Sequence, residues 1–83
     1  MEKFLKTYQA HIEKYQKLLL AETEYLAAAK RAQESEAQRN IHQAEIRRLE
    51  DLIQLCILIC EDIKEFEKEV KQEYEFKRNL LLR

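Results

Sequence analysis

The sequence contains no glycine and no proline among its 83 residues. These two residues supply most tight turns and phosphate-binding loops, so their absence excludes a fold with many short connections. Glu, Lys, Gln, Ala, Leu and Arg dominate instead, and these residues favour helices most strongly. The composition therefore predicts an all-α protein.

The chain also lacks a strong excess of charge of either sign. Charged residues make up 37% of it, yet the formal net charge is −1. A nucleic-acid-binding protein usually presents a basic face and has a high pI, so we expect no nucleic-acid partner. Only two cysteines and a charged beginning, "MEKFLK", fit a reducing cytoplasm, and we expect a cytoplasmic protein.

No apolar run is long enough to cross a membrane. Residues 52–60 are the longest such run and include one polar side chain, Gln54. A spanning helix needs about 20 apolar residues, so we expect no membrane span. A single domain of 83 residues buries a small core, which is usually reinforced by a disulfide, a metal or a partner.

Two heptad-type seams, with apolar residues at alternating spacings of three and four, predict two helices. The first seam is Leu5, Tyr8, Ile12, Tyr15, Leu19, Glu22, Leu26 and Ala29. The second seam is Leu49, Leu52, Cys56, Ile59, Ile63, Phe66 and Val70. The two seams are out of phase, and the most polar stretch of the chain, "QESEAQRN", separates them.

We therefore predict one antiparallel coiled-coil hairpin, with a helix over 3–33, a turn over 34–40 and a helix over 41–81. Ser35 or Asn40 is a suitable N-cap for the second helix. A fold near residue 37 would pair facing residues whose numbers add up to 74 or 75, for example Glu22 with Leu52. The alternative is one continuous helix of about 120 Å, dimerising along its length.

A two-helix hairpin would leave apolar side chains uncovered. Leu55 lies at the margin of the second seam, and Ile57 and Leu58 lie about 130° to either side of its centre. A helix that is apolar all round is normally buried all round, so the hairpin should be completed by a partner or by dimerisation. The end of the chain would extend past the first helix and carries further candidate contact residues: Tyr74, Phe76, Leu80 and Leu81.

The sequence contains few residues that could form a metal site or a catalytic site. Cys56 and Cys60 are spaced to point to one face of a helix, but a structural zinc site needs four ligands, and His11 and His42 are the only imidazoles. Both histidines are expected at the surface and both cysteines in the core. We expect no enzyme, no cofactor and no metal, because a cysteine nucleophile needs a base and an electropositive setting.

The run "EAQRNIHQAEIRRLEDLIQLCILICEDIKEF", residues 36–66, resembles the second helix of the small needle-subunit co-chaperones of type III secretion systems. The resemblance implies a cytoplasmic helical hairpin that pairs with a tetratricopeptide-like chaperone. Together the two proteins would keep a needle subunit unpolymerised before export. The chain lacks the glycine often found at the turn of that family, and its second helix is longer.

Three functions remain open at this point. The first is a non-enzymatic chaperone or adaptor subunit that binds a helical partner protein. The second is a self-assembling module, in which two hairpins form a four-helix bundle with Leu55, Ile57 and Leu58 at the shared interface. The third is a small metal- or redox-responsive regulator that uses Cys56 and Cys60.

Overall fold

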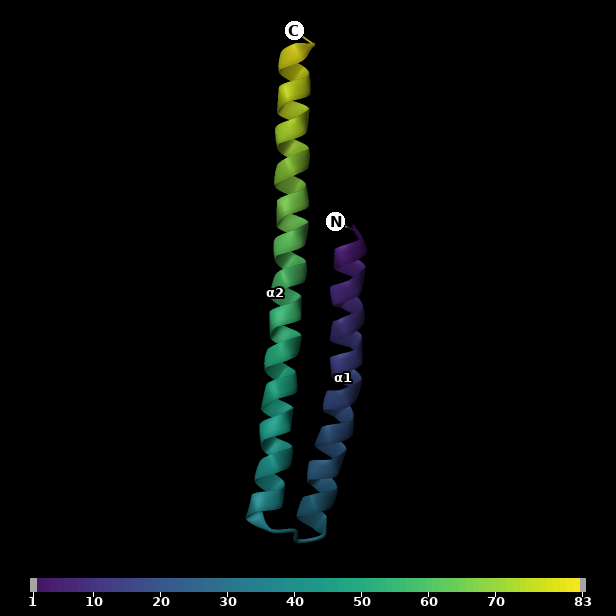
Figure 1. Ribbon diagram of the computed structural model, residues 1–83, viewed down its shortest axis with the longest axis vertical. Coiled ribbons are helices and arrows are strands. Elements are labelled where there is room, and N and C mark those ends of the chain that lie inside the picture. Colours follow the sequence, from purple (N-terminus) through teal and green to yellow (C-terminus); the bar gives the residue numbers. More distant parts are fainter. Residues whose placement is uncertain (1, 83) are drawn as a thin grey trace.

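The computed structural model describes residues 2–82, which form two α-helices lying side by side (Figure 1). Helix α1 spans Glu2–Arg31, and helix α2 spans Glu36–Leu81. The molecule is a rod with extents of 74 × 16 × 13 Å. The predicted antiparallel two-helix hairpin is confirmed.

Helix α1 ends in a Schellman motif that contains no glycine. Gln33 adopts a left-handed conformation, with φ of 56°. Its N–H donates to the carbonyl oxygen of Lys30 at 3.2 Å, and the N–H of Glu34 donates to that of Ala29 at 3.0 Å. These two bonds satisfy carbonyl groups that the end of a helix would otherwise leave without partners.

Helix α2 begins earlier than the sequence pattern indicated. Ser35 is its N-cap, and the Ser35 hydroxyl accepts a hydrogen bond from the N–H of Gln38 at 3.3 Å. Asn40, the other candidate cap, lies inside the helix. The connection therefore covers residues 32–35, and the turn predicted over 34–40 is too long.

The shorter turn changes the register of the hairpin. Facing residues have numbers that add up to about 67, as the helix ends Arg31 and Glu36 and the contact of Tyr25 with His42 show. The predicted value of 74 or 75 is wrong by one heptad. Glu22 lies near the level of residue 45 and is hydrogen-bonded to His42, one turn nearer the beginning of α2, whereas Leu52 lies farther along α2.

Both helices contribute a continuous seam to the interface between them. All eight predicted seam residues of α1 are buried or half-buried. The seam of α2 is His42, Ile46, Leu49, Ile53, Cys56, Cys60, Ile63 and Glu67, all buried or half-buried. Leu52 and Ile59, predicted at its centre, are half-buried at its margin, because the seam is rotated toward Ile53 and Cys60.

The fully buried core is very small. Ala29 and Leu49 are 2% exposed, Cys60 is 6% exposed and Cys56 is 7% exposed. The remaining seam residues keep part of their surface in contact with solvent. A core of this size stabilises a single chain only marginally.

Helix α2 extends well beyond the beginning of α1 (Figure 1). Phe66 and Val70 were predicted inside the intramolecular seam, but their side chains are 55% and 49% exposed. The reason is the register: Glu2, the first described residue of α1, lies at the level of about residue 65 of α2. We call residues 66–82 the overhang. Every residue from 68 to 82 is exposed.

Candidate partner-binding surface

The three surplus residues predicted in the middle of α2 do not form one surface. Leu55 and Leu58 are 54% and 47% exposed, as a partner-binding role requires, whereas Ile57 is half-buried. With the observed seam as reference, Leu58 points directly away from α1 and Ile57 lies about 80° from the seam centre. The three side chains therefore point in different directions, and their role in binding a partner stays a prediction.

The four candidate residues near the end of the chain are all exposed and helical. Tyr74 is 66% exposed, Phe76 64%, Leu80 53% and Leu81 88%. Tyr74 and Leu81 continue the seam of α2, because they follow Glu67 at intervals of seven residues. Phe76 lies on the opposite side of the helix, so a single helix packed on the seam would leave it uncovered.

A larger apolar surface runs along one side of the hairpin and includes residues from both helices. On each helix it occupies the heptad position immediately before a seam residue, and His11 and Glu45 are the polar members of that position. In an antiparallel pair these positions lie on the same side. We call this surface the apolar flank: Phe4, Leu18 and Tyr25 of α1, with Leu52, Ile59 and Phe66 of α2.

The residues of the apolar flank keep much of their surface in solvent. Phe4 and Tyr25 are 61% and 60% exposed, and Leu18 is 45% exposed. Leu55 adjoins the flank next to Leu52 and widens it. Reading each helix separately hid this surface, because it becomes visible only when the positions of both helices are combined.

The opposite side of the hairpin is polar. We call it the polar flank: Gln9, Gln16 and Thr23 of α1, with Gln43, Glu50 and Lys64 of α2. Ile57 is the apolar exception on this side, and it is half-buried. The two flanks lie on either side of the same seam, yet one is apolar and the other is polar. A hairpin with only solvent on both sides would not need an apolar flank.

One ion pair lies at the turn-proximal end of the apolar flank. Nε of Arg48 donates to a carboxylate oxygen of Glu45 at 3.0 Å, and an Nη2 atom contacts the other oxygen. The hydrogen bond from Arg48 lowers the pKa of Glu45. The pair leaves this end of the flank without net charge and limits the apolar surface there.

A hydrogen bond between the helices joins Glu22 to His42. The Glu22 carboxylate accepts from Nδ1 of His42 at 2.6 Å, and both side chains are half-buried. The ring of Tyr25 lies 6.3 Å from that of His42. His11 stacks against Tyr15, with ring centroids 6.1 Å apart. Both histidines were expected at the surface and are half-buried instead: His42 is a member of the α2 seam, and His11 lies beside the α1 seam.

The two cysteines are free and buried in the seam. Their packing agrees with the role of small core residues. No group of three or more His, Cys, Asp or Glu side chains within residues 2–82 is arranged to hold a metal ion. Neither helix, over the same residues, contains a stretch long and apolar enough to cross a membrane.

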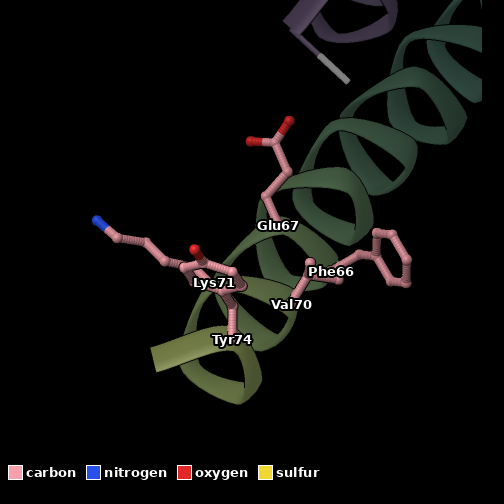
Figure 2. A pocket seen from close by; sticks show the side chains of 5 residues that line it. All are labelled: Phe66, Glu67, Val70, Lys71 and Tyr74. Atoms are coloured by element: carbon pink, nitrogen blue, oxygen red, sulfur yellow. The ribbon is translucent and has the colours of Figure 1, made fainter. Parts of the chain in front are cut away.

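A shallow groove marks the beginning of the overhang. Phe66, Glu67, Val70, Lys71 and Tyr74 line it. Figure 2 shows Phe66 and Lys71 extending to opposite sides of α2. The surface of the groove is mostly apolar. The groove continues the line along α2 that α1 contacts nearer the turn.

Comparisons of the chain with protein-family models, with curated proteins and with solved structures find no match.

Proposed function

We propose that the chain is a non-enzymatic chaperone or adaptor subunit that binds a helical partner protein through its apolar flank. The observation that supports this function is the contrast between the two flanks. Leu18 and Tyr25 are 45% and 60% exposed on one side, while Gln16 and Thr23 occupy the corresponding positions on the other. Burying a large apolar side chain contributes about 1.5–3 kcal/mol, so a bound partner would add substantially to a small core.

The shape of the flank favours a helix as its partner. Its residues occupy one heptad position along both α1 and α2, interrupted on α1 by His11, and this repeat matches that of a third helix laid along the hairpin. A helix in this position would convert a two-helix hairpin into a three-helix bundle. Such a bundle would cover Leu18, Leu52 and Leu55 together.

Within this class, we propose the specific role that the resemblance of residues 36–66 implies. The chain would act as a co-chaperone of a type III secretion needle subunit, together with a tetratricopeptide-like chaperone. A hairpin with one exposed apolar side is suited to this task, because a helical chaperone can cover that side while the complex holds the needle subunit.

The test is co-expression of the chain with a needle subunit and a tetratricopeptide-like chaperone of a type III secretion system. The variant Leu18→Glu/Leu55→Glu places two charges on or beside the apolar flank. The matched control Gln16→Glu/Gln54→Glu adds the same charge outside it. We expect the unaltered chain and the control to purify as a soluble complex and the flank variant to be lost from it. Equal loss in both variants, or no complex with the unaltered chain, would contradict the proposal.

A self-assembling module is the second candidate, and the same flank supports it. Two hairpins related by a two-fold axis could pack their apolar flanks together into a four-helix bundle. The chain has a mass of 10.1 kDa. Light scattering after size exclusion separates the candidates: a stable dimer that Leu18→Glu/Leu55→Glu dissociates favours self-assembly, and a monomer favours the adaptor.

A further inference from the structure

The overhang repeats the pattern of an interface whose second helix is missing. From Glu2 of α1 to the turn, the seam of α2 is covered by α1. Beyond that level the same seam continues through Val70, Tyr74, Lys77 and Leu81, which are all exposed and have no helix opposite them within residues 2–82. The groove lined by Phe66, Val70 and Tyr74 lies on the part of α2 that extends past Glu2 of α1. The uncovered stripe is thus continuous with an established helix–helix interface.

One side of this stripe is basic. Lys64, Lys71 and Arg78 recur at intervals of seven residues, so they lie in one row beside the seam. None of the three takes part in an ion pair within the described part of the chain. The row on the other side contains Phe66 and Glu73, and Glu73 already contacts Nζ of Lys77 at 3.3 Å.

These charges disfavour a second copy of the chain in the antiparallel direction. In an antiparallel pair the same flank of each helix meets its equivalent on the partner. Lys71 and Arg78 would therefore face the basic row of the second overhang. Like charges in facing positions repel, which selects against this pairing.

A second copy packed in the parallel direction is disfavoured by a steric clash. Helix α2 continues without interruption from Glu36 to Leu81. A second copy laid parallel on the overhang would have its own α2 running on toward the turn, along the line that α1 occupies (Figure 1). The two helices would collide at the beginning of α1. A suitable occupant must therefore end at, or turn away from, the level of Glu2.

We propose that the overhang binds an α-helix of a different protein, with an apolar seam and acidic residues in the row that meets Lys71 and Arg78. The helix would lie on α2 end to end with α1. The overhang of residues 66–82 offers between four and five turns of contact at about 3.6 residues per turn. The inference rests on the proposed function and extends it, because it gives a helical partner protein a second site on this chain that can be tested separately from the apolar flank.

Two synthetic peptides of about five helical turns provide the probes. Both have leucine at the seam positions, and they differ only in the row that meets Lys71 and Arg78, which is glutamate in one and lysine in the other. Binding is measured by fluorescence anisotropy below the concentration at which each peptide associates with itself. We expect the glutamate peptide to bind about tenfold more tightly, the effect of two or three partly exposed ion pairs acting together.

Charge reversal supplies the decisive comparison. Lys71→Glu/Arg78→Glu should invert the preference between the two peptides. Lys3→Glu/Lys68→Glu, which makes the same charge change outside the basic row, should leave the preference as it is. Tyr74→Lys should weaken binding of both peptides. Circular dichroism checks that each variant keeps the helicity of the unaltered chain.

Several results would overturn the inference. These are equal binding of both peptides, no binding of either, or a preference that survives Lys71→Glu/Arg78→Glu. Binding that is lost in Leu18→Glu/Leu55→Glu but unaffected by Tyr74→Lys would place the peptide on the apolar flank instead. A dimer of the unaltered chain that Tyr74→Lys dissociates would assign the overhang to a second copy. Failure of the needle-subunit co-expression alone would contradict the proposed function and leave the peptide result standing.

Discussion

The carboxylate of Glu22 and the imidazole of His42 meet across the hairpin at 2.6 Å, within a seam whose other members on α1 are apolar or aromatic. A hydrophobic heptad seam can slide by seven residues and still bury apolar side chains. A polar pair cannot slide without losing its partner. We infer that the Glu22–His42 contact selects the observed register over the one that is shifted by a heptad.

The first prediction concerns the strength of this contact. Replacing Glu22 alone by leucine should lower the free energy of unfolding by about 1 kcal/mol, because His42 loses its hydrogen-bond partner in a half-buried site. Replacing both residues, Glu22→Leu/His42→Leu, should raise stability by about 1–3 kcal/mol, since an apolar pair replaces a desolvated polar one. Urea denaturation of the double-mutant cycle measures both effects.

The same double variant should also be less uniform in register. Spin labels on exposed Lys17 and Gln54 would report one distance in the unaltered chain and a broader distribution in the variant. A single narrow distribution in both proteins would mean that the turn alone fixes the register.

The second prediction concerns the end of α1. Gln33 has a left-handed backbone conformation, in which the Cβ of most residues clashes with the backbone. Glycine has no Cβ and adopts this conformation without the clash. Gln33→Gly should therefore raise the free energy of unfolding by about 0.5–1 kcal/mol. Ala32→Gly, one residue earlier, should lower stability, because only Gln33 has a positive φ among the described residues. Thermal unfolding of the two variants, followed by circular dichroism, distinguishes them.

The third prediction compares two leucines of α2. Leu49 is 2% exposed and Leu58 is 47% exposed. Leu49→Ala should lower stability by about 2–4 kcal/mol through lost burial and the remaining cavity. Leu58→Ala should change it by less than about 0.5 kcal/mol. Comparable losses in chemical denaturation would show that the outer side of α2 is covered in solution, for example by a second copy.

The fourth prediction tests the cysteines. Because Cys56 and Cys60 are buried in the seam, their reaction with a thiol reagent should be slow in the folded chain and accelerate as denaturant is added. Cys56→Ala/Cys60→Ala should reduce stability and preserve partner binding. Fast labelling of the native protein, or loss of binding without loss of stability, would favour a redox-responsive regulator.

The sequence pattern was sufficient for the fold class and the eight seam residues of α1, and it gave Ser35 as one of two candidate caps for α2. It was insufficient for the register. A shift of seven residues satisfies the heptad repeat equally well, so the position of the turn determines the register of the two helices. Without a glycine to mark the end of α1, the polar stretch from 33 to 40 did not distinguish a second helix that begins after Ser35 from one that begins after Asn40.

The apolar flank was missed for a different reason. Leu52 and Ile59 fit a seam when α2 is read alone, and Leu18 and Tyr25 have no evident role when α1 is read alone. Their shared side follows only from the antiparallel pairing and the rotation of the seam toward Ile53 and Cys60. The signal was present in the spacing of seven residues, but it required both helices and the correct phase.

The overhang has one further consequence, which concerns how tightly anything can bind there. A helix without tertiary contacts depends on its own propensity and frays at its end. Part of the interaction free energy would then be used to order the overhang, so affinity would depend on how helical it already is. Asn79 is exposed and lies away from the seam, so replacing it by alanine would touch no ligand and still tighten binding through preorganisation. The dissociation constant of a partner would thus be tuned by residues that never contact it.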